Sequence, residues 1–183
     1  MANEISLSSQ TLNRYLDILQ ETFVVFRVYS YSNNLGNELK KSCKAYFYDL
    51  GIRNAILKDF SPLAGRFDKG ALLESFVFLK LQSHLAPNME IKFWRTKEGD
   101  EVDFILLRDR KPIPIEVKSE LSEFEIPKGL RRFLTRYPQT PFGYVINTDQ
   151  TQILKTENGA IQFLTFEKFG QLENLNTLGV VRK

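Results

Sequence analysis

The sequence is poor in the residues that build disulfides and thiolate or imidazole metal sites. Its 183 residues include one cysteine, Cys43, and one histidine, His84. One cysteine excludes a disulfide within the chain and a zinc site made of several thiolates. One histidine excludes chemistry that needs two imidazole ligands from this chain. The scarcity of cysteine also favours a reducing compartment, and we expect a cytoplasmic protein.

Long apolar runs, a phosphate-binding loop and a large net charge are also missing. No apolar stretch reaches the roughly 18 residues of a membrane span, and the N-terminus lacks a signal-peptide pattern, so we expect no membrane partner. The glycine spacing at residues 65–70 suggests a P-loop, but Ala71 and Leu72 stand where lysine and serine or threonine are required. We therefore expect no ATPase activity in this chain. The net charge of only +3 means that a nucleic-acid partner must be sought in local patches.

A strand–turn–strand pattern at residues 101–119 is the most informative stretch that is present. Two apolar runs, at 102–107 and 113–118, flank a charged turn. The turn has the composition of a hairpin loop, and we centre it on Asp109 and Arg110.

This hairpin register brings two carboxylates together. Asp103 faces Glu116, and directly opposite side chains have Cβ atoms about 4.5–5.5 Å apart. Two carboxylates so placed repel each other, so a compensating cation is needed. Lys118 points to the same face as Glu116 and is one candidate. A bound divalent cation is the other, and the hairpin alone leaves both open.

A third acid lies on the long helix predicted at residues 68–85. On a helical wheel, Glu74 falls among apolar residues that include Val77 and Phe78. A carboxylate on such a face is costly unless it is paired or binds a metal. The alternatives are a partly exposed glutamate near the helix end, or one satisfied by a backbone or arginine partner.

The N-terminal segment reads as a helix followed by two strands. Ser8 and Ser9 precede an apolar spacing of 3, 4 and 7, and strands are predicted at 22–29 and 44–48. This order is typical of the end of a winged-helix unit, although an ordinary structural appendage fits equally. A turn-rich boundary at 61–65 divides the chain into segments 1–60 and 61–183. Met1 directly before the first helix suggests an artificial start within a longer protein.

A helix at residues 127–137 has one apolar and one basic face, with Pro127 placed well for its start. The basic residues are Lys128, Arg131, Arg132 and Arg136. They predict contacts to a phosphate backbone, and the alternative is a solvated face of a core helix. A strand is predicted at 142–147 and an edge strand at 161–165.

The order of helix glutamate, strand aspartate and strand Glu-x-Lys resembles the PD-(D/E)xK nuclease superfamily. By motif, Asp103 takes the first acidic position, Glu116 the second, Lys118 the lysine position and Glu74 the preceding-helix acid. Val102 departs from the pattern, because the family name has proline before the aspartate. The resemblance implies an α/β (α+β) restriction-endonuclease-like core with a central mixed sheet. It also implies Mg²⁺ or Mn²⁺ held by the three acids, with Lys118 as a further catalytic residue.

A narrower resemblance covers nearly the whole chain. The residues around Glu74 and the runs 93–95, 101–104 and 115–118 look like the nuclease-like C-terminal domain of archaeal and bacterial AAA-type ATPases. That domain has no assigned function. The resemblance implies a winged-helix remainder at the N-terminus, an ATPase module on the parent chain and DNA as substrate, and a homo-oligomer stays open. The alternatives are a catalytically silent binding or regulatory module, and a DNA reader built on the winged-helix segment.

Overall fold

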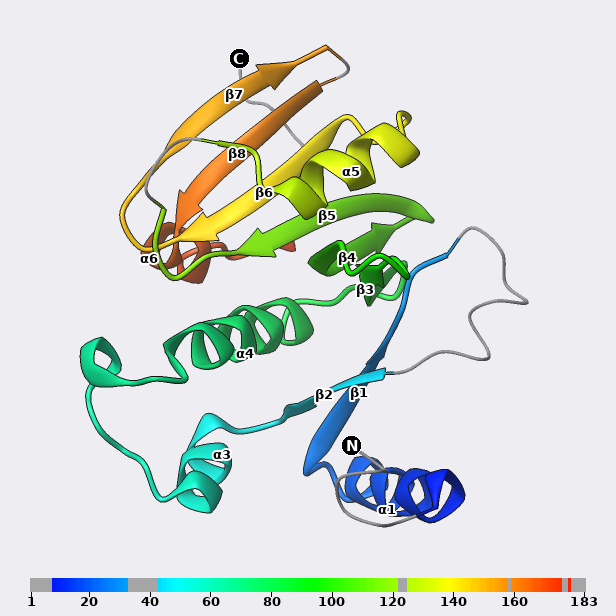
Figure 1. The fold of residues 1–183 in the computed structure, drawn as a ribbon, viewed down its shortest axis with the longest axis vertical. Helices are drawn as coiled ribbons and strands as arrows, with labels where there is room; N and C mark the ends of the chain where they lie inside the picture. The colour runs from blue at the N-terminus through cyan, green and yellow to red at the C-terminus, as the bar shows by residue number, and fades with distance from the viewer. Residues whose placement is uncertain (1–7, 33–42, 122–124, 158, 176–177, 179–183) are drawn as a thin grey trace.

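A six-stranded mixed sheet forms the centre of the computed structural model, which describes residues 8–32, 43–121, 125–157, 159–175 and 178 (Figure 1). Its order is β3-β4-β5-β6-β8-β7. The bounds are β3 Met89–Arg95, β4 Glu101–Arg108, β5 Lys111–Val117, β6 Phe142–Asn147, β8 Gly159–Thr165 and β7 Gln152–Thr156. Strands β3, β4 and β5 form an antiparallel meander, β5, β6 and β8 run parallel, and β7 returns antiparallel to β8.

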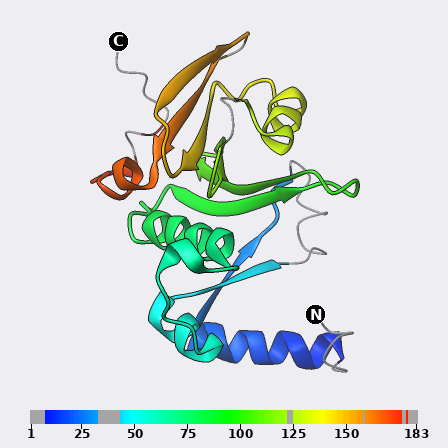
Figure 2. The same ribbon diagram turned by 60° about the vertical axis from the view of Figure 1, so that its left-hand side comes forward.

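Helices cover both faces of this sheet, which confirms the predicted mixed fold (Figures 1 and 2). Helix α4 (Lys69–Gln82) buries Phe78 against one face, in a cluster with Phe104 and Ile115. Helix α5 (Lys128–Arg136) buries Phe133 against the other. The short helix α6 (Phe166–Gly170) follows β8. Because each helix buries apolar side chains on one face, the sheet is apolar on both.

The N-terminal unit consists of a helix, a two-stranded sheet and a second helix. Its elements are α1 (Ser9–Glu21), β1 (Val25–Tyr29), β2 (Cys43–Phe47) and α3 (Leu50–Leu57), and a 3₁₀ turn (Leu63–Gly65) follows. The Ser8 hydroxyl accepts a hydrogen bond from the Thr11 backbone N–H at 3.1 Å, so the predicted cap is confirmed. Strands β1 and β2 are antiparallel, as a helix-and-two-strands unit requires.

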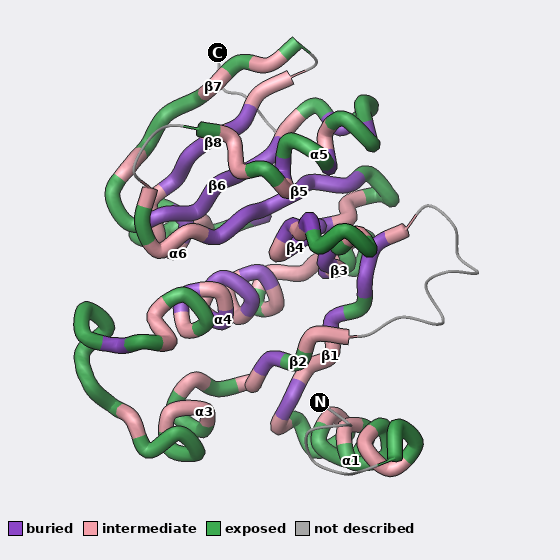
Figure 3. Tube along the Cα trace, in the orientation of Figure 1, coloured by how far each residue is buried: buried purple, intermediate pink, exposed green. Residues whose placement is uncertain are grey.

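This unit is fastened to the main sheet at two places. The Tyr31 backbone N–H donates to the carbonyl of Phe93 at 2.6 Å, which continues a parallel bridge from Ser30 along the edge strand β3. Tyr46 of β2 stacks on Phe78 of α4, with ring centroids 4.5 Å apart. The small sheet therefore shares a core with α4. Figure 3 shows the opposite pattern in α1 and α3, whose residues are all exposed or intermediate.

The predicted hairpin is confirmed over five residue pairs, from Arg108 with Lys111 to Phe104 with Ile115. Both turn residues have positive φ angles, 50° at Asp109 and 64° at Arg110. That backbone is the one that a two-residue hairpin loop needs, so the turn itself sets the register.

The prediction of an edge strand at 161–165 is wrong. Strand β8 lies between β6 and β7, and its side chains Ile161 and Phe163 are buried as in a central strand. The edge on this side of the sheet is β7, a mostly exposed strand whose short Gln-Ile-Leu-Lys-Thr sequence gave little strand signal. Among the described helices, none is long and apolar enough to cross a membrane.

Candidate functional site

Strand β4 contains a bulge next to the predicted acidic pair. Lys92 of β3 pairs with Ile105, but Trp94 pairs with Val102, so β4 has one more residue than β3 in this interval. Val102 and Ile105, three residues apart, consequently both pack on the α5 side of the sheet, whereas Phe104 packs on the α4 side. A bulge re-aims the side chains beside it. Here it directs Asp103 towards α4 and β2.

The Asp103 side chain accepts a hydrogen bond at the place where the backbone hydrogen-bond ladder of the hairpin ends. The last backbone pair joins Phe104 to Ile115, so the ladder stops one pair short of the predicted match between Asp103 and Glu116. Beyond it, the Val117 backbone N–H donates to Asp103 Oδ2 at 2.9 Å. A carboxylate therefore replaces a strand carbonyl as acceptor, and Asp103 is tied to the strand that carries Glu116.

Lys44 of β2 brings three carboxylates together from α4 and β4. Its Nζ lies 2.9 Å from Glu74 Oε1, 2.6 Å from Glu101 Oε1 and 3.6 Å from Asp103 Oδ1. The Tyr46 hydroxyl donates to Glu74 Oε1 at 2.5 Å. Within the described residues, Glu74 is thus partnered by a lysine and a tyrosine, and not by the backbone or an arginine.

Glu116 and Lys118 form a second pair at the end of β5. Lys118 Nζ lies 2.8 Å from Glu116 Oε1, and Glu116 is only 5% exposed. The other oxygen, Glu116 Oε2, is buried and has no hydrogen-bond partner in the described part of the chain. Such an atom is costly in a folded protein, and an incoming cation or donor is one way to satisfy it.

The acids of this site perturb one another. Burial, followed by repulsion from Glu116 and Glu74, raises the pKa of Asp103 to about 7. Burial also raises the pKa of Glu116, although Lys118 opposes the effect. Burial alone would lower the pKa of Lys44, but attraction to Glu74 and the other acids outweighs it and raises that pKa. All three pKa values are therefore raised, and shifts caused by burial and by neighbouring charges together occur often at functional sites.

The residues suit a hard divalent cation by type but not in their present placement. Carboxylate oxygens are the ligands that Mg²⁺ and Mn²⁺ prefer, and the buried Glu116 Oε2 lacks a partner. Yet no three of the described histidine, cysteine, aspartate and glutamate side chains are grouped to hold a metal ion. The Lys44 ammonium lies among the carboxylates of Glu74, Glu101 and Asp103 instead.

Three residues of this cluster were not predicted from the sequence. Glu101 is two residues before Asp103, so strand alternation could have placed both on one side. Lys44 and Tyr46 share that spacing on β2, but no local signal connects β2 with α4. Their contacts with Glu74 span 30 and 28 residues of chain.

The basic face of α5 divides into paired and unpaired cations. Lys128 Nζ lies 3.2 Å from Asp100 Oδ1, and Arg132 Nη1 lies 3.0 Å from Asp100 Oδ2. Asp100 is 6% exposed, so these pairs fasten α5 to the turn before β4. Arg136 has no acidic partner within the described ranges.

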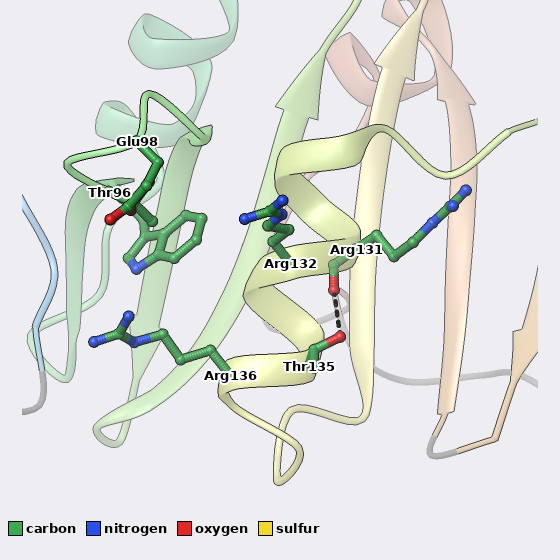
Figure 4. Close-up of a pocket in the computed structure, with 7 residues that line it drawn as sticks. Thr96, Glu98, Arg131, Arg132, Thr135 and Arg136 are labelled. Carbon is green, nitrogen blue, oxygen red and sulfur yellow. Dashed lines mark hydrogen bonds between the residues drawn. The ribbon is translucent and has the colours of Figure 1, made fainter.

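A pocket of about 400 Å³ lies between α5 and β3. It is lined by Trp94, Thr96, Glu98, Arg131, Arg132, Thr135 and Arg136. Figure 4 shows Arg132 and Arg136 extending from α5 towards the segment with Thr96 and Glu98, while Arg131 extends away. Trp94 is only 4% exposed and packs edge-on against Phe133, so the arginines are the groups that the pocket offers to a ligand, and they suit an anionic one.

The N-terminal turn of α5 adjoins the acidic cluster. A Cβ atom added to Gly129 would lie 1.8 Å from the carbonyl oxygen of Glu101, so only glycine fits there. The N-terminal turn of α5 therefore touches the backbone of β4 at Glu101, the residue whose carboxylate pairs with Lys44.

The chain is similar to two proteins described only as uncharacterized, Mb2031c of Mycobacterium bovis and Rv2008c of Mycobacterium tuberculosis. Each is 31% identical to it over 120 residues. The match takes in 64% of this chain but 27% of each relative, so the chain spans about a quarter of their length. One chain in a solved assembly of Thermococcus gammatolerans McrB AAA+ hexamers with bound McrC has a remotely similar fold. The match has a TM-score of 0.40 and 13% identity, and covers 56% of this chain and 30% of that one, which is too little to carry weight.

Two family profiles match adjoining parts of the chain. Residues 1–63 match a domain of unknown function, DUF8612. Residues 69–168, which include α4, the acidic cluster of β4 and β5, and all of α5, match the domain of unknown function DUF4143. This second match takes in more than half of the chain, and the chain belongs to the DUF4143 family.

Proposed function

We propose that this domain is a metal-dependent nuclease-like module that hydrolyses phosphodiester bonds in DNA. The observation that carries the proposal is the convergence of α4, β4 and β5 on one acidic cluster. Glu74 and Asp103 share the Lys44 ammonium, and Asp103 binds the strand that carries Glu116 and Lys118. Their order is that of the PD-(D/E)xK pattern.

Each residue has a distinct role in the proposed reaction. Glu74, Asp103 and Glu116 would hold a Mg²⁺ or Mn²⁺ ion, which when bound lowers the pKa of a water molecule and offsets phosphate charge. The Val117 N–H fixes the Asp103 carboxylate, and the Tyr46 hydroxyl fixes that of Glu74. Lys118 is 41% exposed at its side chain, so its ammonium can reach a phosphate and stabilise the charge that develops there.

The α5 side of the molecule supplies the proposed DNA contacts. Arg136 and the neighbouring pocket offer positive charge, which suits the phosphates of a nucleotide strand. Lys128 and Arg132 already share Asp100, so their contribution to phosphate binding is smaller. DNA would then extend from this pocket towards the cluster at the start of β4.

We place the domain on a longer protein with an ATPase module. The support is the sequence resemblance to a C-terminal domain of AAA-type ATPases, together with the greater length of the mycobacterial relatives. In this arrangement the ATPase module would precede the present chain in the sequence of the longer protein.

A catalytically silent interaction module is the second candidate. Two observations favour it: lysines already neutralise much of the acidic cluster, and apolar side chains of the N-terminal unit are exposed. Tyr15, Ile18 and Phe23, in and after α1, are 54%, 47% and 71% exposed. An apolar surface of this kind is typical of a contact with another protein module.

Metal binding and DNA cleavage separate the two candidates. Calorimetry with Mn²⁺ is expected to give binding at millimolar or lower concentration in the wild type and none in Asp103→Asn. Cleavage of plasmid and single-stranded DNA is expected to fall at least about a hundredfold in Asp103→Ala and in Lys118→Met. Activity that survives both substitutions belongs to a contaminant. A wild type that neither binds Mn²⁺ nor cleaves DNA in its presence leaves the silent module as the function.

A further inference from the structure

The Lys44 ammonium is placed as a bound cation would be. Three carboxylate oxygens, from Glu74, Glu101 and Asp103, lie within 3.6 Å of its Nζ. These acids come from α4 and β4, whereas Lys44 comes from the N-terminal sheet. The cation is thus supplied by one family segment, residues 1–63, and the acids by the other, residues 69–168.

The N-terminal sheet holds Lys44 at this point. Lys44 pairs with Val28 in the ladder between β1 and β2, and Tyr46, two residues on, stacks against Phe78 of α4. The Lys44 side chain is 18% exposed, and its Nζ lies 5.6 Å from the centre of the Phe93 ring. A partly buried ammonium with three anionic partners on a fixed strand is a pre-formed occupant and not a mobile surface group.

One ammonium and one divalent cation cannot share these oxygens. A cation such as Mg²⁺ or Mn²⁺ requires oxygen ligands at roughly 2.0–2.2 Å, while Lys44 Nζ already takes Glu74 Oε1 and Glu101 Oε1 at 2.9 and 2.6 Å. Repulsion between the two cations would add to this competition. The grouping of three acids becomes open to a metal only when the ammonium leaves.

We propose that Lys44 and a divalent cation are mutually exclusive occupants of the cluster formed by Glu74, Glu101 and Asp103. The N-terminal sheet thereby controls metal loading of the catalytic domain, and Glu101 joins the ligand set. This inference rests on the proposed metal-dependent function. Any event that draws β2 away, such as movement of a module attached to the N-terminal unit, would free the site.

Mn²⁺ affinity in matched lysine variants tests the proposal. Lys44→Met keeps the aliphatic volume and removes the charge. Lys92→Met is the control, because Lys92 has a side-chain exposure of 12% and an acidic partner, Glu90, at 2.7 Å, and its strand neighbour Trp94 packs on the α5 face. Free Mn²⁺ measured by electron paramagnetic resonance should show at least tenfold tighter binding in Lys44→Met. Binding in Lys92→Met should stay within twofold of the wild type.

The outcomes distinguish this inference from the function on which it rests. Equal Mn²⁺ affinity in the wild type and Lys44→Met overturns the competition but leaves the metal site intact. No Mn²⁺ binding in any variant overturns the metal site and the inference together. Addition of Asp103→Asn to Lys44→Met should abolish the gain in affinity.

A second measurement uses the wild-type protein and does not depend on a variant that folds. Lysine acylation read by mass spectrometry reports how accessible each ammonium is, and ion pairing with three carboxylates slows the reaction at Lys44. Saturating Mn²⁺ should raise the labelling of Lys44 at least threefold and leave that of Lys92 unchanged. Labelling of Lys44 that does not respond to bound Mn²⁺ overturns the inference.

Discussion

Two clusters of charged side chains, one around Asp68 just before α4 and one around Glu74 within α4, are balanced differently. Before the helix, Arg66 Nε and Arg53 Nη1 each lie 2.8 Å from an oxygen of Asp68. Hydrogen bonds from Arg66, the larger effect, hold the pKa of Asp68 well below its usual range. At the candidate site, Lys44 faces three carboxylates, and burial with acid–acid repulsion raises the pKa of Asp103 to about 7.

The contrast predicts which cluster stabilises the fold more. A guanidinium fork around one carboxylate satisfies every partner and fastens the segment between α3 and α4. At the candidate site Lys44 and Arg95 both pair with Glu101, but Asp103 stays buried beside Glu116 and Glu74 with its charged form disfavoured. We therefore expect Asp103 to stabilise the fold less than Asp68 does. Stability and pH measurements on Asp68 and Asp103 test this distinction.

The largest expected effect on stability comes from Asp68→Ala. The substitution leaves the Arg66 side chain, which is 1% exposed, without its two-point partner. An arginine stranded in this way costs more than a surface ion pair, and the thermal midpoint should fall by more than about 5 °C. Asp103→Asn should leave the midpoint unchanged or raise it. A calorimetric scan of both variants at pH 7 makes the comparison, and a larger loss in Asp103→Asn would reverse our assignment of the structural cluster.

The pH dependence of Asp103 is the next effect in size. A folded-state pKa of about 7, above the ordinary 3.8, means that the folded protein binds the extra proton between these values. The stabilising contribution is complete below pH 4 and is lost as the pH rises through 7. Between pH 5 and 8 the wild type should lose roughly 2–3 kcal/mol of unfolding free energy from this group.

Urea unfolding of the wild type and Asp103→Asn at pH 5 and pH 8 measures this loss. The amide does not titrate, so its curve should be flatter over the interval. Parallel curves for the two proteins would show that the environment of Asp103 does not disfavour its charged form.

Asp68 should give a slope of the opposite sign. Its pKa is lowered in the folded state, so its stabilisation is present above pH 4 and is lost as the pH falls further. Asp68→Asn should therefore remove part of the acid sensitivity below pH 4 and leave the interval from pH 5 to 8 unaltered. Acid titration followed by circular dichroism tests the slope, and unchanged acid sensitivity would mean that Asp68 is not held in its charged form by the arginines.

The sequence predicted the hairpin well because its determinants are local. Asp109 and Arg110 form the turn, and alternation fixes each later pair as far as Phe104 and Ile115. The strand at 142–147 was also found with its exact bounds, since its apolar run is continuous. Glu74 was singled out correctly as an acid that needs a partner, although the partner itself was not found.

The remaining features depend on contacts between distant segments. The bulge at Asp103 exists only relative to β3, and the apolar run of β4 hides it from the sequence pattern. Lys44 reaches Glu74 because β2 packs on α4, and nothing near Lys44 in the chain encodes that neighbour. The pairing of Arg132 with Asp100 was missed for the same reason. Sequence patterns therefore located the acids but not the cations that hold them.

The smallest expected effect comes from the basic residues of α5, which also include cations with and without an acidic partner. Arg136→Ala should lower DNA affinity and reduce the slope of log affinity against log salt by about one unit, as for one lost phosphate contact. Lys128→Ala is the matched control on the same helix, since that lysine is already held 3.2 Å from Asp100. Its slope should change by clearly less than one unit. Fluorescence anisotropy over a salt series compares the two, and equal slopes would mean that pairing with Asp100 does not withdraw a cation from DNA.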